Sequence, residues 1–187
     1  MKKCLAFTVF AALVYTNQSL GSNINYDFFE LGYLEAENDA ANFDGDGYGL
    51  NASVGFTPTL AFVLGYQDIE DGSDAASLKS LGIAYHKPYS ATGDMVLGLS
   101  AVETETKPLG GGTVDGSGNE FILEIRNRSS AETEFSLGLT RLEIEDDSDS
   151  GYQFGIVSGN PQGFQFVLRY IDRDDTNSIS LGLRSSF

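Results

Sequence analysis

Seven charged residues lie in stretches of sequence in which every second residue is large and apolar, and the charged residues occupy the positions in between. They are Glu30, Glu120, Glu124, Arg126, Arg128, Arg169 and Arg184. Residues two apart share a face of a β-strand, so these charges project from the face opposite the apolar one. Charges enclosed in a protein are stable only when they are paired. We therefore expect an ion-pair network, with Glu30 and Arg184 as its best single pair, that serves either as an ion path or as packing that stabilises the fold.

Residues suited to catalysis are scarce. His86 is the only histidine and Cys4 the only cysteine, so acyl-transfer triads and most zinc sites lack their parts. We interpret His86 as a structural polar residue near a turn. The three glycines at 110–112 are not followed by the Lys-Ser/Thr pair of a phosphate-binding loop. We predict that the protein is not an enzyme and has no resident cofactor.

Aspartates gather in several short stretches. Carboxylate oxygens can hold Ca²⁺, but none of these stretches has the spacing of an EF-hand loop, so we predict at most loosely bound Ca²⁺. A solvated acidic rim is the simpler interpretation. The weak metal candidates are Asp44, Asp46, Asp146, Asp147 and Asp149.

The elements that must position these residues are strands. Residues 47–67 contain two runs with apolar and small or polar residues in alternation, joined by Thr57-Pro58-Thr59. This pattern is typical of a β-hairpin. The same alternation recurs along the chain and predicts ten strands, or eight if the first or the seventh is irregular. Acidic loops follow the odd strands and tight turns follow the even strands, so we expect an all-β, closed, antiparallel up-and-down barrel.

The N-terminal residues and the net charge limit the classes of protein to which this chain can belong. Lys2 and Lys3 precede an apolar stretch too short to span a membrane as a helix, which is typical of a signal peptide. We predict a signal peptide at 1–21 and one domain at 22–187. The formal charge of −16 falls by two, to −18, when the two lysines are removed. Such an acidic chain lacks the basic surface that nucleic acid requires.

Aromatic residues mark two heights of the predicted strands, and aliphatic residues lie between them. Tyr48 and Tyr66 stand toward the acidic end of the strands, and Phe56 and Phe164 stand toward the tight-turn end. This order is typical of strands that face lipid between two aromatic girdles. It disfavours a third possibility, a soluble periplasmic barrel with its apolar face inward.

With its signal peptide, girdles and terminal strand ISLGLRSSF, the chain resembles the small Gram-negative outer-membrane β-barrel family, the porin-like and OmpA-type proteins. The resemblance covers residues 22–187. It implies an outer-membrane location and contact with lipid and lipopolysaccharide, and we expect the barrel to be a monomer. It also implies insertion by the barrel-assembly machinery, which reads a terminal residue such as Phe187, although Ser185 departs from the usual apolar pattern. Tight turns would face the periplasm and acidic loops the exterior.

Two classes of function remain at this point. The first is a structural or narrow porin-like channel with a charged lumen. The second is a surface binding protein whose Asp-rich loops engage divalent cations or an extracellular partner.

Overall fold

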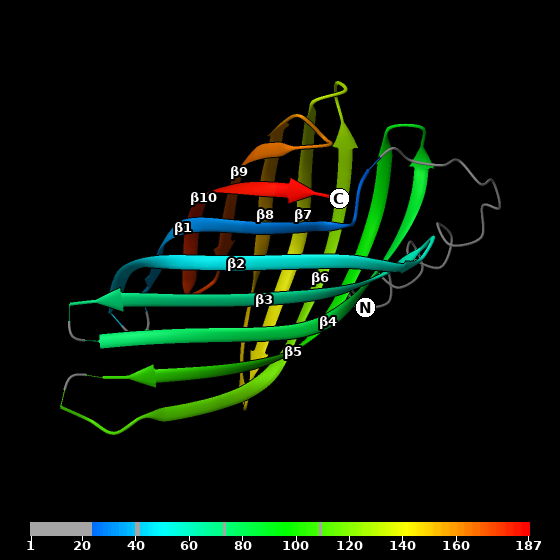
Figure 1. Cartoon of the computed structure of the whole chain (residues 1–187). Helices are drawn as coiled ribbons and strands as arrows, with labels where there is room; N and C mark the ends of the chain where they lie inside the picture. Colours follow the sequence, from blue (N-terminus) through cyan, green and yellow to red (C-terminus); the bar gives the residue numbers. More distant parts are fainter. Residues whose placement is uncertain (1–23, 40–41, 73, 109) are drawn as a thin grey trace.

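The computed structural model describes residues 24–39, 42–72, 74–108 and 110–187. The predicted signal peptide lies outside these residues. The described chain forms one closed antiparallel barrel in which each strand pairs with its neighbours in sequence and the first strand pairs with the last (Figure 1). The ten strands are β1 (Phe28–Asn38), β2 (Phe43–Thr57), β3 (Leu60–Asp71), β4 (Asp74–Ser90), β5 (Gly93–Lys107), β6 (Val114–Arg128), β7 (Thr133–Ile144), β8 (Asp147–Gly159), β9 (Phe164–Arg173) and β10 (Thr176–Ser186).

The predicted ten-strand barrel is confirmed, and the eight-strand alternative is wrong. Closure between β1 and β10 places Glu30 directly opposite Arg184 in the register. It also gives every strand two partners, which removes the free edges of an open sheet. The hairpin β2–β3 folds as predicted, with Ala52 opposite Leu64.

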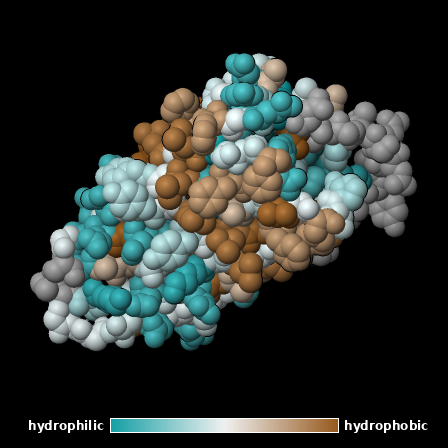
Figure 2. All heavy atoms as spheres, in the orientation of Figure 1, coloured by the Kyte–Doolittle hydropathy of each residue, from teal (hydrophilic) through white to brown (hydrophobic). Residues whose placement is uncertain are grey.

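An apolar belt surrounds the barrel. Large side chains at alternate positions of every strand point outward and are exposed, such as Leu64, Leu81, Leu137 and Leu181. Figure 2 shows this belt as a brown band between two hydrophilic ends. In the described part of the chain, no helix is long and apolar enough to cross a membrane. An outward apolar band with polar residues inside is the arrangement of a barrel that faces lipid.

The two ends of the barrel differ in charge rather than in loop length. We call the end with the β1–β2, β3–β4, β5–β6, β7–β8 and β9–β10 connections the acidic end, and the other the tight end. At the acidic end β3 stops at Asp71 and β4 starts at Asp74, while β7 stops at Ile144 and β8 starts at Asp147. Most acidic residues at this end are therefore on strands, so the acidic end consists largely of strand ends rather than of the predicted acidic loops.

Strand length explains this difference. A tilted strand needs about 9 to 11 residues to span a membrane, whereas β4 has 17 residues and β2, β5 and β6 have 15 each. The extra residues continue the hydrogen-bond ladder beyond the apolar belt, where carboxylates can stay hydrated. Strands β9 and β10, with 10 and 11 residues, are close to the minimum. The barrel is therefore taller on the side of β4 to β6, as Figure 1 shows at its lower left.

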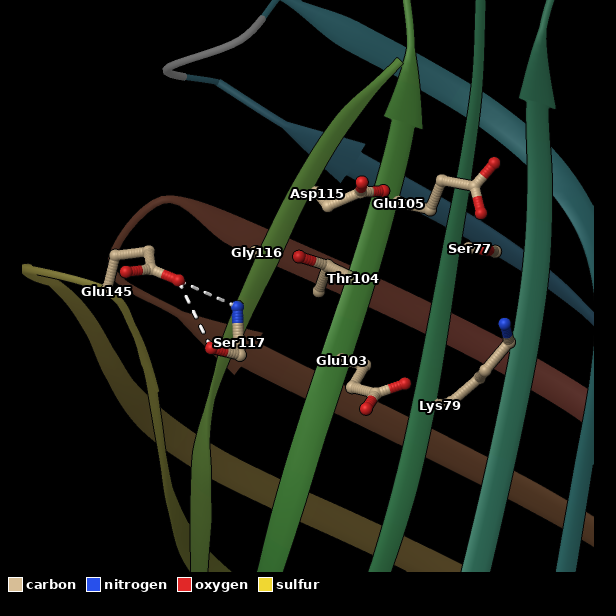
Figure 3. A pocket seen from close by; sticks show the side chains of 9 residues that line it. All are labelled: Ser77, Lys79, Glu103, Thr104, Glu105, Asp115, Gly116, Ser117 and Glu145. Carbon is tan, nitrogen blue, oxygen red and sulfur yellow. Dashed lines mark hydrogen bonds between the residues drawn. The ribbon is translucent and has the colours of Figure 1, made fainter.

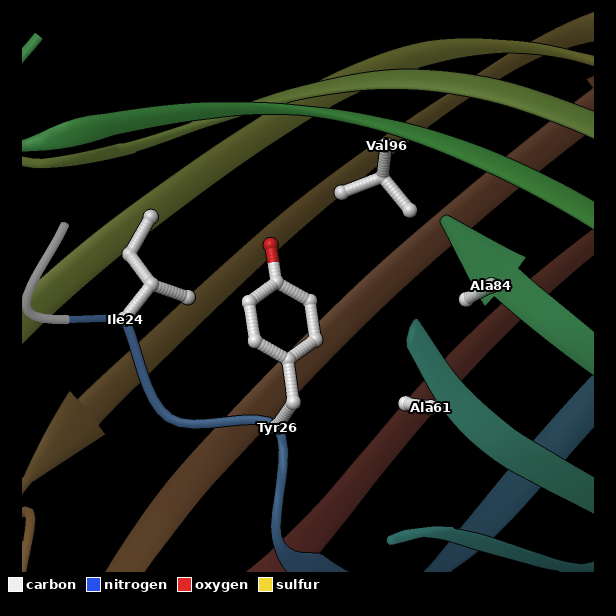
Figure 4. Packing of buried hydrophobic residues seen from close by; sticks show 5 residues of the cluster. All are labelled: Ile24, Tyr26, Ala61, Ala84 and Val96. Carbon is white, nitrogen blue, oxygen red and sulfur yellow. The ribbon is translucent and has the colours of Figure 1, made fainter. Parts of the chain in front are cut away.

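Side chains fill both ends of the interior. At the acidic end Leu34, Ala36 and Ile69 form a buried apolar cluster with Phe43 packed against it. At the tight end a second cluster consists of Ile24, Tyr26, Ala61, Ala84 and Val96. Figure 4 shows that Ile24 and Tyr26 come from the segment before β1, while the other three residues come from strands. The ionic groups lie between and beside these two clusters.

Candidate functional site

The centre of the lumen contains one glutamate held by two arginines. Arg184 on β10 donates from Nε and Nη2 to Glu30 Oε2 at 3.1 and 3.0 Å. Arg169 on β9 donates from Nε to Glu30 Oε1 at 2.9 Å and from Nη2 to Oε2 at 3.0 Å. Glu30 is 4% exposed and Arg184 3% exposed, whereas the side chain of Arg169 is 28% exposed, so water reaches this centre from the side of Arg169. The guanidinium of Arg184 also lies 3.9 Å from the ring centre of Phe28.

A second ionic group lies on β6, β7 and β8. Arg126 donates from Nε to Glu134 Oε1 at 2.7 Å, and the same nitrogen lies 3.8 Å from Glu124 Oε1. Gln153 donates to Glu124 Oε2 at 2.7 Å. Arg126 therefore sits between two carboxylates, and each of these carboxylates has a partner. Such charge-assisted hydrogen bonds compensate for the loss of hydration inside the barrel.

The remaining predicted lumen charges lie further out. Glu120 ion-pairs with Arg173 on β9, which was not among the predicted residues and which also donates to Thr140 Oγ1 at 3.0 Å, toward the acidic end. Arg128 is half-buried at the tight end of β6, and among the described residues it has no ion-pair partner. The structure thus brings six of the seven predicted residues into ion pairs, distributed over three groups rather than one.

His86 belongs to a polar cluster at the tight end. Its ring stacks on Tyr26 with 3.7 Å between the ring centres. The Tyr26 hydroxyl donates to Asp94 Oδ2 at 2.9 Å, and His86 Nδ1 lies 3.6 Å from that same oxygen. Asp94 is fully buried. Arg126 lies 4.7 Å from the centre of the Tyr26 ring, which connects this cluster to the second ionic group.

A hollow of about 300 Å³ opens at the acidic end among β4, β5 and β6. Four carboxylates and one lysine line it together with small polar residues (Figure 3). Glu145 accepts hydrogen bonds there from the backbone N–H and the hydroxyl of Ser117, at 3.0 and 3.2 Å. The lining residues are Ser77, Lys79, Glu103, Thr104, Glu105, Asp115, Gly116, Ser117 and Glu145.

The five weak metal candidates do not converge. Asp44 and Asp46 lie on β2, whereas Asp147 and Asp149 lie on β8 and Asp146 in the turn before it. Strands β1, β10 and β9 separate β2 from β8 around the barrel. Within the described ranges, no three His, Cys, Asp or Glu side chains are placed to hold a metal ion.

Several interior residues escaped the sequence reasoning. Asp94 and Glu134 alternate correctly with the inward residues of β5 and β7, but each is the second residue of its strand, and neither was among the predicted lumen charges. Arg173 is the last residue of β9 and was not predicted either. Tyr26 precedes the first strand, so no strand periodicity applied to it. Longer strands would have revealed the first three, while only the tertiary structure reveals the position of Tyr26.

Comparisons with known proteins support the fold. No protein-family model and no curated protein matches the chain. The chain is similar to the N-terminal β-barrel domain of Pseudomonas aeruginosa OprF, with 10% identity and a TM-score of 0.52 over 86% of this chain and 99% of that one. The outer membrane protein OprG of the same organism is 13% identical, with a TM-score of 0.48 over 91% of this chain and 99% of that one.

At these sequence identities the similarity shows only that the folds are shared. This conclusion rests on the comparison with the OprF domain, which has the higher TM-score of the two. The closed ten-strand barrel and its apolar belt agree with the predicted location in a bacterial outer membrane. The chain therefore has the fold of the small outer-membrane β-barrels that its sequence resembles.

Proposed function

We propose that the protein is an integral outer-membrane barrel that forms a narrow, normally closed channel for ions. The observation that carries this proposal is the chemistry of the lumen centre, where Glu30 and Arg184 are buried and form ion pairs, with Arg169 bound to the same carboxylate. A lumen packed in this way offers no wide path for solutes. A resting state without conduction follows.

The use of charges favours a channel over a purely structural filling. Replacing a buried ion pair by apolar residues of similar volume is often neutral or stabilising. This chain fills the acidic end around Leu34 with apolar side chains, yet it places arginines and glutamates at the centre. Charged groups there stabilise a barrel interior less than apolar groups would, but they can solvate an ion when the network rearranges.

For the placement in the membrane we propose the orientation that the family resemblance implies. The acidic end faces the exterior and the tight end faces the periplasm, with lipid and lipopolysaccharide around the apolar belt. Phe187 lies at the tight end with 72% of its surface exposed, where the barrel-assembly machinery can read it. The barrel is a monomer, contains no cofactor and catalyses no reaction.

Single-channel recording of refolded residues 22–187 in planar bilayers tests the proposal. We expect long closed intervals with small, brief openings, and more frequent openings in Arg184→Gln, because this change removes one of the two arginines that hold Glu30. Arg141→Gln, at an exposed pair on the outer face, is the matched control and leaves the recording unchanged. Folding is checked by heat-modifiable gel migration. Silence of the folded native chain and of every lumen variant would refute the channel.

A second candidate function is binding at the exterior surface. The hollow at the acidic end, with Glu103, Glu105, Asp115 and Glu145 around it, favours a cationic ligand or partner. Titration of the folded barrel with Ca²⁺ and with a lysine-rich peptide tests this candidate. Saturable binding that is lost in Glu103→Gln/Asp115→Asn supports it, and unsaturable, salt-sensitive association contradicts it.

A further inference from the structure

The segment before β1, residues 24–27, turns into the barrel at its tight end. Asp27 fixes its position: its carbonyl oxygen accepts the N–H of Phe187 at 3.1 Å, and its carboxylate accepts the N–H of Gly55 at 2.7 Å. Asn25 Oδ1 in turn accepts the N–H of Asp27 at 2.9 Å, which forms a local turn. Asn25 Nδ2 also donates to the carbonyl oxygen of Phe187 at 3.4 Å. Asp27 is thus bound to the barrel wall, and the side chains of Ile24 and Tyr26 project from this segment into the lumen.

The strands around this segment leave room for an aromatic ring. Ala61 on β3 is fully buried beneath the segment, and Ala84 on β4 lies beside it. Both alanines point into the lumen, and Ile24 and Tyr26 occupy the space that larger side chains would fill (Figure 4). The segment therefore closes the tight end with two apolar side chains.

The contacts that hold the ring differ from those that hold a strand. Residues 24–27 are not part of a β-strand, whereas every strand has a hydrogen-bond ladder on each side. Tyr26 is retained by a hydrogen bond to Asp94, a stack on His86 and the guanidinium of Arg126. Side-chain contacts of this kind can be broken and remade without disturbing the barrel.

We propose that residues 24–26 are a removable plug that hinges at Asp27 and closes the periplasmic mouth of the lumen. This inference rests on the proposed channel and names the element that closes it. Arg126 couples the plug to the ionic groups beneath, because the same guanidinium contacts the Tyr26 ring and Glu134. Withdrawal of the ring frees Arg126 on one side and exposes Asp94, which opens the mouth and loosens the layer below.

A cysteine beneath the plug reports its movement. Residues 22–187 contain no cysteine, so Ala61→Cys introduces a single thiol at a position that water reaches when the plug leaves. The refolded barrel in vesicles is treated with a water-soluble, membrane-impermeant maleimide, and labelling is followed by mass shift. The rate is measured in the Ala61→Cys chain and after adding Tyr26→Phe, Tyr26→Ala or, as the control, Tyr48→Ala. Tyr48 is an exposed tyrosine on the lipid-facing side.

We expect slow labelling in the Ala61→Cys chain and about tenfold faster labelling with Tyr26→Phe, because one hydrogen bond corresponds to about a tenfold change in an equilibrium constant. Tyr26→Ala, which also removes the ring, labels faster still, and Tyr48→Ala leaves the rate unchanged. Equal rates in all four chains would overturn the plug. The plug would also be overturned if Tyr48→Ala accelerated labelling as much as Tyr26→Ala does.

Conductance recorded in parallel separates this inference from the proposed function. Faster labelling together with more frequent openings in Tyr26→Ala supports both. Faster labelling in a barrel that never conducts supports a movable plug and refutes the channel. Openings whose frequency is the same in the native chain and in Tyr26→Ala support the channel and overturn the plug as its gate.

Discussion

Removing Glu30 should destabilise the barrel more than removing either arginine bound to it. Glu30→Gln leaves Arg169 and Arg184 facing each other without a carboxylate, and the loss of one partner from a buried pair costs about 3 to 5 kcal/mol. Arg184→Gln leaves Glu30 with two hydrogen bonds from Arg169. We therefore expect a smaller loss for Arg184→Gln, about 1.5 to 3 kcal/mol, the range for hydrogen bonds to a charged group.

The double variant Glu30→Gln/Arg184→Gln sharpens the test. In this variant Arg169 is the only charged residue of the three that remains, and its side chain is 28% exposed. The double variant should therefore lose less stability than the sum of the two single losses, by about 1 kcal/mol or more. Exposed Glu143→Gln is the control and should change stability by less than about 0.5 kcal/mol.

Urea unfolding of the refolded barrel in vesicles measures these free energies. The chain has no tryptophan, so the folded fraction is followed by the gel migration of unheated samples. A loss for Arg184→Gln equal to that for Glu30→Gln, or strictly additive losses in the double variant, would refute Glu30 as the centre of a coupled triad.

Three further predictions concern the belt, the terminus and metal. Leu64→Arg, on the lipid face of β3, should cost about 2 to 4 kcal/mol, while Asp68→Arg, beyond the belt on the same face, should be tolerated; equal urea midpoints would contradict the belt. Phe187→Ser should lower the amount of barrel assembled in outer membranes with little effect on refolding in vitro, and an equal defect in both assays would argue against an assembly signal. Removing Ca²⁺ with a chelator should leave the urea midpoint unchanged, since the described residues hold no three-ligand acidic group; a fall in the midpoint would show a site.

The barrel could be predicted because the alternation of neighbouring residues in the sequence already specifies each strand and its lipid-facing side. Alternation in segments such as residues 47–67 decides which side chains face lipid, and a slip of one residue would reverse every one of them. The pairing of Glu30 with Arg184 follows from the same logic, because closure of an even-stranded meander places the first strand beside the last. The strand ends were not predictable in this way. Where β3 and β4 leave the belt, charged residues such as Asp68, Glu70 and Lys79 occupy the outer face, and the apolar alternation that marks a lipid-facing strand disappears.

The sequence by itself determined the antiparallel order, the lipid face and most of the charges inside, and it favoured ten strands over eight. The tertiary structure alone decided how those charges are shared and what closes the tight end. Arg169 reaches Glu30 from β9, two strands from β1, because a side chain of this length passes over the intervening strand β10. Tyr26 meets His86 and Asp94 because the chain turns inward at Asp27. Contacts across a lumen depend on barrel curvature and side-chain length, and neither leaves a periodic trace in the sequence.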